Sequence, residues 1–518
     1  MNSETAKSQP ARPPVVTAIT GRVAEMRKLA QALASAEAEF VAVYGRRRVG
    51  KTFLVREFFG AAIRFELTGI HGVSLAEQLG NFAAALGRAK GLSEKLRPPG
   101  SWLEAFEQLA RHMESLPPAA AGRKHVVFLD ELPWLDTRRS KFCSALEHFW
   151  NSWASRRKDL LLVVCGSAAS WMIQRVVEAK GGLHNRITRR IRLLPFTLAE
   201  TAAFLKSRGV ELTPYQVIEL YLAVGGVPHY LKMAEPGWSA FQIIDRLCFS
   251  PQGELRDEFD RLYASLFDSA EEHLAIVKAL AGKREGLTRN ELLAATGLPS
   301  GGSASRHLDE LAESGFIHPA IPFGRKEKDA LYRLSDEFSL FHCTWIAPLG
   351  KRSTEGDYWM KQRQSPKWRA WSGYAFEGIC LKHAQQLKVA LGISGVQTTE
   401  APWRHHPPKG ETGAQIDLLI DRADETITLC EMKFSEGVFT IDKRYAEELR
   451  QKREVFRRVT GTRKNLFIVM VTTHGVADNA YAKELVAGSV VAEALLKEQA
   501  EPTAMKRFYS FIPNKGSS

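Results

Sequence analysis

Short apolar runs alternate with amphipathic stretches over residues 17–197. The strand-like runs are EFVAVYG (39–45), AIRFEL (62–67), HVVFLD (125–130), LLLVVCG (160–166) and RIRLLPF (190–196). The most apolar of these runs are rich in valine and leucine and show little alternation, which is typical of central strands covered on both faces. Amphipathic stretches such as TFLVREFFG lie between the runs. This order predicts an α/β domain built on a doubly wound parallel sheet.

The pattern changes after this domain. Residues 198–268 lack strand signals and open on a Thr-x-x-Glu capping box, so they are expected to form a helical lid. Residues 269–348 show three short helical patterns and then two strand-like pieces around the charged turn RKEKD, which predicts a winged-helix domain. Residues 349–370 are charged and poor in pattern and are expected to be a linker. Residues 371–518 predict a second α/β domain, and residues 1–16 a disordered tail.

Composition and charge indicate in which compartment the protein works and which partners it binds. The chain has 518 residues, of which 45% are hydrophobic and 25% charged, and its net charge is +13. This surplus suits a polyanionic partner, and nucleic acid is expected, with DNA favoured over RNA. The six cysteines are scattered and form no CxxC pair, which predicts a reducing cytoplasm without disulfides. No run approaches the roughly 18 apolar residues of a membrane span, so no membrane partner is expected.

The stretch GRRRVGKT (45–52) fits the pattern G-x-x-x-x-G-K-[ST] without deviation. A loop of this kind turns its backbone N–H groups toward phosphate oxygens, and glycines permit the required dihedral angles. Lysine then reaches the β- and γ-phosphates, and the final hydroxyl ligates Mg²⁺. The three arginines stand at variable positions, where their charge adds attraction for a triphosphate. The predicted nucleotide-binding residues are Gly45, Arg46, Arg47, Arg48, Val49, Gly50, Lys51 and Thr52.

Three further positions fit a nucleotide site. Asp130 ends an apolar strand, where it would hold Mg²⁺ through water, and Glu131 beside it is the candidate base for the attacking water. A strand that merely ends in acidic residues is the alternative. Ser167 follows another apolar strand and is either a γ-phosphate sensor or part of a small-residue turn. Arg186 either supplies charge to the γ-phosphate of a neighbouring subunit, in a homo-oligomer, or is an ordinary solvated arginine.

A second constellation lies in AQIDLLIDRADETITLCEMKFS (414–435). A hairpin through the DETI turn would bring Asp417 and Glu431 together, and Mg²⁺ would relieve the repulsion between the two carboxylates. Lys433 shares the face of Glu431 and could stabilise a pentavalent phosphate, and Glu377 on the preceding helix could add a third carboxylate. The alternative is a surface ion pair between Glu431 and Lys433 on an edge strand.

Two segments could contact nucleic acid. In the helix after the hairpin, Arg450, Arg453 and Arg457 share one face, which suits either phosphate contact or a solvated surface. The third helix of the predicted winged helix carries Arg306 and His307 in the usual groove-facing position. Winged helices also mediate protein contacts, so the sequence favours DNA recognition by this helix but leaves a protein contact as the alternative.

The order of the motifs resembles one family. A GR-x-x-E box, the phosphate loop, the LDE strand, CGSAASWM, GGLHNR…LPF and YLAVGGVPHYL resemble archaeal-type P-loop ATPases of the wider AAA/STAND group. The resemblance implies ATP at residues 45–52, Mg²⁺ at Thr52 and Asp130, and a catalytic Glu131. A winged helix and a restriction-endonuclease-like C-terminal domain recur in the same family.

The second constellation resembles PD-(D/E)XK nucleases, except that Ile416 stands where the motif has proline. The resemblance implies Mg²⁺ at Glu377, Asp417 and Glu431, with Lys433 beside the attacking water. We therefore expect an ATP-hydrolysing protein coupled to a metal-dependent nuclease on DNA, in genome defence or mobile-element control. The alternatives are an ATP-dependent switch or scaffold, or a winged-helix regulator, whose nuclease-like domain binds without cutting.

Overall fold

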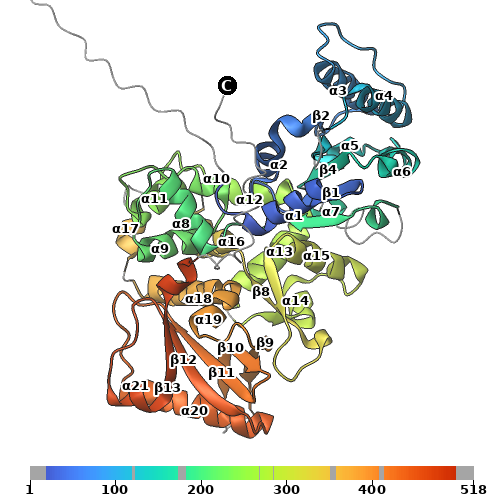
Figure 1. Cartoon of the computed structure of the whole chain (residues 1–518). Coiled ribbons are helices and arrows are strands. Elements are labelled where there is room, and N and C mark those ends of the chain that lie inside the picture. The colour runs from blue at the N-terminus through green and yellow to red at the C-terminus, as the bar shows by residue number, and fades with distance from the viewer. Residues whose placement is uncertain are drawn as a thin grey trace, which may run out of the picture.

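The computed structural model describes residues 19–119, 123–167, 169–172, 182–267, 269–283, 285–350, 358–363, 365–407 and 413–497. The tail expected at residues 1–16 lies outside the described residues. Figure 1 shows one sheet region in blue to teal, a second in orange to red, and green and yellow helical regions between them. In the described part of the chain, no helix combines the length and the apolar character needed to cross a bilayer.

The first sheet has five parallel strands in the order β2-β3-β4-β1-β5. The expected parallel sheet and each of its predicted strands are confirmed. Every residue of β1, β3 and β4 is buried, because these central strands are covered on both faces. The strands are β1 (Glu39–Tyr44), β2 (Ile63–Thr68), β3 (His125–Asp130), β4 (Leu160–Gly166) and β5 (Arg189–Arg192).

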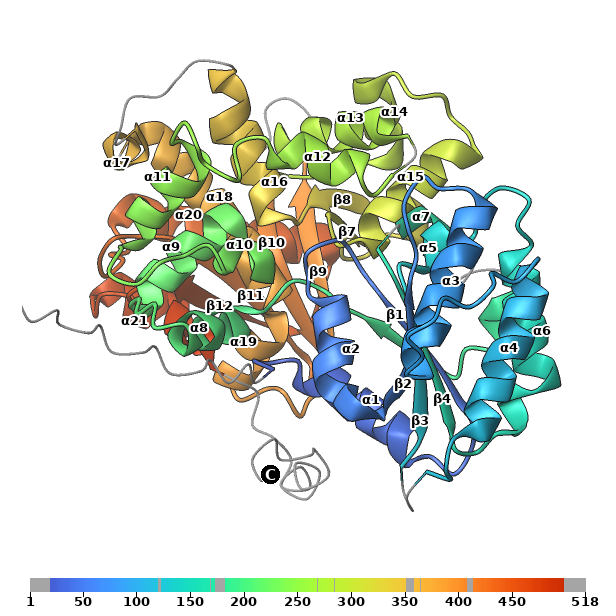
Figure 2. The ribbon, with the colours of Figure 1, turned by 90° about the horizontal axis from the view of Figure 1, so that it is seen from above.

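Helices cover both faces of this sheet and build two separate cores. Alternate side chains of β1 show the division: Val41 and Val43 pack into one core, and Phe40 and Ala42 into the other. Figure 2 shows α1 and α2 on one side of the sheet and α3, α4 and α6 on the other. These helices are α1 (Val23–Ala34), α2 (Lys51–Phe59), α3 (Leu75–Ala89), α4 (Trp102–Ser115) and α6 (Phe142–Ser152), with the short α5 (Leu132–Leu135) and α7 (Ala169–Met172) beside them.

The next segment is helical, as its pattern predicts. The capping box that opens it is formed, since Thr197 accepts from the backbone N–H of Glu200 and Glu200 accepts from that of Thr197. Its helices are α8 (Leu198–Ser207), α9 (Pro214–Val224), α10 (Pro228–Leu231), α11 (Ala240–Cys248) and α12 (Glu258–Ala264).

Three helices and a small antiparallel sheet follow, with the strand order β6-β8-β7. The predicted helices and the β7–β8 hairpin are present, whereas β6 has two residues, too few to show a pattern. The elements are α13 (Ala270–Ala281), β6 (Leu287–Thr288), α14 (Arg289–Thr296), α15 (Gly302–Glu313), β7 (Ile317–Ala320) and β8 (Leu331–Leu334), and α16 (Glu337–Phe341) comes next.

The second sheet is mixed, in the order β13-β12-β11-β10-β9, with β9–β10–β11 antiparallel and β11–β12–β13 parallel. The predicted hairpin of β10 and β11 is confirmed. Helix α18 packs on one face and α20 on the other. The elements are α18 (Pro366–Lys382), α19 (Ala384–Ala390), β9 (Thr398–His405), β10 (Ala414–Arg422), β11 (Thr426–Lys433), α20 (Lys443–Thr460), β12 (Asn465–Thr472), α21 (Ala480–Leu485) and β13 (Val486–Val491).

The expected linker at 349–370 is wrong for its described residues. Residues 358–362 form α17 (Tyr358–Gln362), in which Trp359 is only 1% exposed. Its ring lies 5.0 Å from Trp345 and 5.8 Å from Trp371 and stacks on Phe249. A five-residue helix shows no periodicity, yet one buried tryptophan contributes a large apolar contact area.

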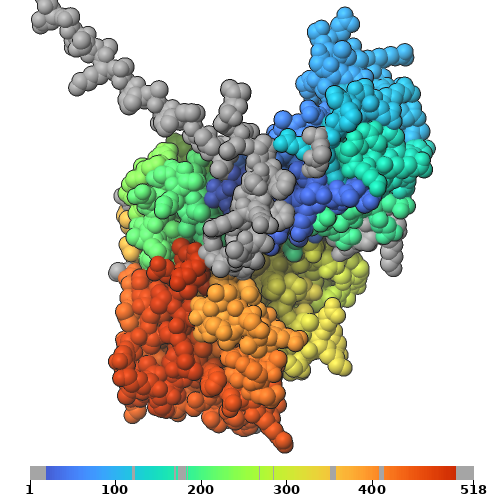
Figure 3. Space-filling model, in the orientation of Figure 1, coloured from blue at the N-terminus to red at the C-terminus, as the bar shows by residue number. Residues whose placement is uncertain are grey.

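This aromatic cluster belongs to one apolar core that runs from Phe196 to Leu495. The helical segment, the α13–β8 segment and the second sheet therefore share a core, and Figure 3 shows their green, yellow and orange surfaces in contact. A rearrangement of one of these parts must disturb its neighbours.

We expect Trp359→Ala to lower the free energy of unfolding by about 3–5 kcal/mol, because it removes a buried aromatic side chain and leaves a cavity. Urea unfolding followed by tryptophan fluorescence and by circular dichroism measures the change. Met360→Ala is the matched control, since Met360 lies in the same helix and is 39% exposed. Equal unfolding curves for the two variants would mean that α17 does not belong to the core.

Candidate functional site

The predicted phosphate loop lies between β1 and α2, at the carboxyl end of the first sheet. Gly45 has a φ of 146° and Gly50 a φ of 91°, both in the region that favours glycine. A Cβ atom on Gly45 would lie 2.2 Å from the carbonyl oxygen of Leu193. The first glycine is thus required by close packing against the segment after β5, and the second by the turn into α2.

Two predicted magnesium ligands, Thr52 and Asp130, contact each other at the carboxyl end of the sheet. The Thr52 hydroxyl donates a hydrogen bond of 2.9 Å to Asp130 Oδ2, although the residues belong to α2 and β3. Burial raises the pKa of Asp130, and the hydrogen bond from Thr52 opposes this. A hydroxyl and a carboxylate, completed by phosphate oxygens and water, fit Mg²⁺.

Lys51 arches back over its own loop. Its ammonium group donates to the carbonyl oxygens of Gly45 and Arg46, each at 2.9 Å. Burial lowers the pKa of Lys51, and nearby carboxylates oppose the shift. The side chain is thus held over the loop by weak carbonyl partners that phosphate oxygens would replace.

Ser167 contacts the candidate base. Its hydroxyl donates a hydrogen bond of 2.6 Å to Glu131 Oε2, and the residues follow β4 and β3. Glu131 has a left-handed backbone, with a φ of 47°, which is uncommon for a residue with a Cβ atom. This contact orients the carboxylate, a pairing that the sequence did not suggest because the residues stand far apart in the chain.

The loop arginines point to three different elements. The guanidinium of Arg46 is buried, pairs with Asp336 at the start of α16 and lies 4.8 Å from the centre of the Phe316 ring. Burial is the largest influence on the pKa of Arg46 and lowers it, but the charge and hydrogen bond of Asp336, together with nearby tyrosines, raise the pKa overall. The expectation that this side chain attracts a triphosphate is therefore wrong, because it faces the interior, away from the cavity described next.

The other two arginines line a cavity. Arg48 forms an ion pair of 2.7 Å with Glu258 of α12, and Arg47 lies 5.6 Å from the centre of the Trp134 ring. The cavity has a volume of about 920 Å³ and lies between the phosphate loop and the helical segment. Its helical wall includes Phe204, Arg208, His229, Lys232, Glu258 and Arg261. The sequence did not indicate these residues as part of the site, although His229 lies within the quoted motif YLAVGGVPHYL. A cavity of this size and mixed polarity accommodates a nucleotide.

Arg186 contacts its own chain. Its guanidinium lies 3.8 Å from Glu147 of α6, and its side chain is 41% exposed. A role in the site of a neighbouring subunit stays a prediction.

The predicted carboxylates of the second site approach one another on three elements. Leu418 of β10 pairs with Cys430 of β11, which brings Asp417 and Glu431 to adjacent strands. Asp417 lies in a β-bulge, where the register between β10 and β9 shifts between Ile416 and Leu419. Ile416 consequently packs on the α20 side, whereas Leu418 packs on the α18 side. Regular alternation would place Ile416, Leu418 and Ile420 on one face of the strand, opposite Asp417, and the bulge breaks this alternation.

Glu377 reaches the cluster from α18. Burial raises its pKa to about 8, and the negative charge of Asp417 adds to the shift, while Arg333 and Lys433 oppose it. A buried carboxylate beside others favours a bound cation, so the residue types fit Mg²⁺. Among the described residues, however, no group of three or more His, Cys, Asp or Glu is close enough to hold a metal. The expected three-carboxylate metal site is therefore not assembled in this structure.

Cationic side chains contact these carboxylates instead. Lys452 of α20 donates to both oxygens of Glu431, at 2.7 and 2.8 Å, and the Tyr445 hydroxyl donates to one of them at 3.2 Å. Arg333 of β8 lies 3.9 Å from Asp417. The sequence offered a signal for Tyr445 and Lys452 only: they stand seven residues apart, which is two helical turns, and so lie on one face of α20.

The basic helix α20 is partly engaged in local pairs. Arg450 contacts Glu484 of α21 at 2.7 Å and Glu447 at 3.1 Å. In the predicted groove-facing helix α15, His307 is buried, while the side chain of Arg306 is 53% exposed. Of these residues, Arg306 remains suitable for phosphate contact, and His307 does not.

Comparisons with known proteins include a family match that covers the first sheet. Residues 19–234 match the family model of an ATPase domain predominantly from Archaea. An uncharacterised protein of Methanocaldococcus jannaschii is 23% identical over 419 residues, which are 80% of this chain and 87% of that protein. A Walker-type ATPase of Pyrococcus abyssi is 17% identical, with a TM-score of 0.44, over 64% of this chain and 98% of its own. From the family match and the geometry of the phosphate loop, residues 19–234 form a P-loop ATPase domain.

Proposed function

We propose that ATP binding and hydrolysis in residues 19–234 regulate a Mg²⁺-dependent nuclease in the second sheet domain, with DNA as its substrate. Genome defence or control of mobile elements is the proposed setting. The observation that carries the proposal is the buried ion pair of Arg46 and Asp336, which joins the phosphate loop to the segment between β8 and α16.

The ATPase roles follow from the site. Lys51 would bind the β- and γ-phosphates, and Thr52 and Asp130 would hold Mg²⁺, which neutralises charge on the phosphates. Glu131, oriented by Ser167, would position the attacking water. The helical wall of the cavity would close over the nucleotide.

The segment that receives Arg46 also contacts the second domain. Glu337, beside Asp336, forms an ion pair of 2.6 Å with Lys382 at the end of α18. Arg333, three residues before Asp336, lies 3.9 Å from Asp417. One short segment therefore contacts the phosphate loop, α18 and the carboxylate cluster. A shift of a few kcal/mol between two arrangements of this segment would change an active fraction about a hundredfold.

Three features support a nuclease acting on DNA. The order of a helix glutamate, a strand aspartate and Glu-x-Lys on the next strand is retained on α18, β10 and β11. The order of α13, β6, α14, α15, β7 and β8 supports a winged helix. The net charge of +13 suits a nucleic-acid partner. Bound Mg²⁺ would supply Lewis-acid activation of a phosphodiester, and Lys433 would stabilise the charge that develops on the phosphate.

A second candidate function is a DNA-binding or scaffolding protein whose nuclease-like domain does not cut. The contacts of Lys452 and Arg333 with the carboxylates favour it, because these cations replace the charge that a metal would supply.

For the ATPase, we expect Lys51→Ala to remove measurable ATP binding, because the ammonium is the main charge partner of the phosphates. Glu131→Gln should keep binding and lower turnover by about 10²–10⁴-fold, since only the group that orients water changes. Calorimetry and phosphate release measure the two effects. Unchanged ATP affinity in Lys51→Ala would refute the site.

For the nuclease, we expect Asp417→Ala to abolish Mg²⁺-dependent cleavage of plasmid and linear DNA while ATP hydrolysis stays largely intact. The two sites lie in separate sheets, so their chemistry is separable. Asp424→Ala is the matched control, because Asp424 lies in the exposed turn between β10 and β11. Equal cleavage by wild type and Asp417→Ala would place the activity elsewhere.

For the coupling, we expect the double variant Arg46→Met/Asp336→Asn to remove the effect of ATP on cleavage while ATP binding persists. Both buried charges are lost together, which avoids the roughly 3–5 kcal/mol cost of leaving one unpaired. An asparagine at position 336 can still accept the hydrogen bond from the backbone N–H of Ser339 that caps α16. Regulation by ATP that survives in the double variant would show that this pair does not couple the domains.

A further inference from the structure

Arg333 is a buried cation that reaches the carboxylate cluster from another part of the chain. It lies on β8 of the small sheet, whereas Asp417 and Glu431 lie on the second sheet. Its side chain is 9% exposed, and its Nη2 lies 3.9 Å from Asp417 Oδ1. Its Nε is buried without a hydrogen-bond partner among the described residues. The guanidinium is thus desolvated and held mainly by charge.

Both strand carboxylates are largely covered, Asp417 beside Arg333 and Glu431 beside Lys452. The side chain of Asp417 is 13% exposed and that of Glu431 only 4%. A phosphodiester must approach both the metal and its ligands to be cut, and this arrangement leaves it little access. A divalent cation bound at Asp417 would also stand beside the guanidinium, and the like charges would repel each other.

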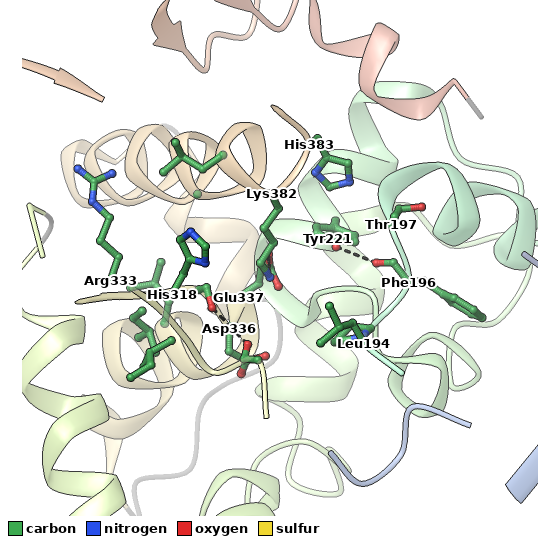
Figure 4. Close-up of a pocket in the computed structure, with 18 of the residues that line it drawn as sticks. Leu194, Phe196, Thr197, Tyr221, His318, Arg333, Asp336, Glu337, Lys382 and His383 are labelled. Atoms are coloured by element: carbon green, nitrogen blue, oxygen red, sulfur yellow. Dashed lines mark hydrogen bonds and ion pairs between the residues drawn. The ribbon is translucent and has the colours of Figure 1, made fainter. Parts of the chain in front are cut away.

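A cavity opens beside β8 and α18 and extends to the segment after β5, where Leu194, Phe196 and Thr197 line it. Its volume is about 670 Å³, and it is also lined by Arg333 and His318 of the small sheet and by Tyr374, Gly378 and Lys382 of α18. Figure 4 shows His318 and Lys382 directed toward its centre and Arg333 at its edge. Atoms around a void lose part of their dispersion contacts, so this region is less tightly packed than the rest of the core that β8 and α18 share. Arg333 lines this void, so its side chain has space into which it can move without a wider rearrangement of the shared core.

We propose that Arg333 is an inhibitory cation that occupies the metal-binding side of the carboxylate cluster and must withdraw before a divalent ion can bind. This inference rests on the proposed nuclease function and specifies how that site is regulated. Asp336 stands three residues after Arg333 and is held by Arg46 of the phosphate loop, so nucleotide binding has a direct route to the movement.

Lys452 does not suit this role, although it contacts Glu431 more closely. It belongs to α20, which packs on the second sheet through the same core as β10 and β11, and so it moves with the carboxylates. Arg333 reaches the cluster from β8 of the small sheet. A movement of β8 can therefore withdraw Arg333 from Asp417, whereas no movement of β8 withdraws Lys452 from Glu431.

The test is Mn²⁺ binding to the full, nucleotide-free chain, measured by the electron paramagnetic resonance signal of free Mn²⁺. We expect Arg333→Ala and Arg333→Gln each to raise the affinity at least tenfold, and Arg333→Lys to stay near wild type. The gain must vanish in Arg333→Ala/Asp417→Ala, which assigns it to this cluster. Arg325→Ala removes an exposed arginine of the loop between β7 and β8 and should leave the affinity unchanged.

Cleavage of linear DNA with Mg²⁺ and without ATP is the second readout, and Arg333→Gln should cut faster than wild type. Unchanged or weaker Mn²⁺ binding in both neutral variants, with wild-type thermal midpoints, overturns the proposal and assigns Arg333 a supporting role at the metal. If Mn²⁺ binds more tightly but no variant cuts DNA, the inhibitory contact stands and the nuclease function fails. The two proposals are therefore separable.

Discussion

The arrangement of the domains depends on one buried ion pair. Arg46 and Asp336 are almost completely shielded from water, and each would be costly to bury alone. The pair fixes a residue of the phosphate loop against the start of α16, a helix whose neighbouring residues contact α18 and the second sheet. Any change in the loop on binding a triphosphate must either keep this pair or expose two charges. This constraint is the physical basis for the proposed coupling between the ATPase domain and the C-terminal half.

Much of the fold was predictable because its signals are local. The strands of the first sheet stand out as apolar runs, and the phosphate loop and the LDE strand carry their chemistry within a few adjacent residues. The contact of Thr52 with Asp130 follows from two strands that end at one edge of a parallel sheet. Elements with little local signal were missed: β6 has two residues, and α17 carries one buried tryptophan in a charged stretch.

The candidate sites were less predictable wherever partners come from distant segments. Nothing near Arg46 in the sequence indicates Asp336, and nothing near Asp417 indicates Arg333, because both pairs form only when separate parts pack together. The bulge at Asp417 was hidden for another reason. Side chains along a regular strand alternate between its two faces, and a single shift of register reverses this alternation within β10. Sequence patterns thus indicated the candidate residues but not the charged side chains that contact them.

The two acidic sites balance their charge in different ways. At the phosphate loop, Asp130 is contacted by a neutral hydroxyl, which leaves its negative charge available to a metal. In the second sheet, Glu431 is contacted by Lys452 and Asp417 by Arg333, so that positive charge is already supplied by the protein. A metal can join the first site with its nucleotide, whereas it must displace a side chain at the second. This difference in local charge is the physical reason for the proposed order, in which ATP binds first and a metal reaches the second site afterwards.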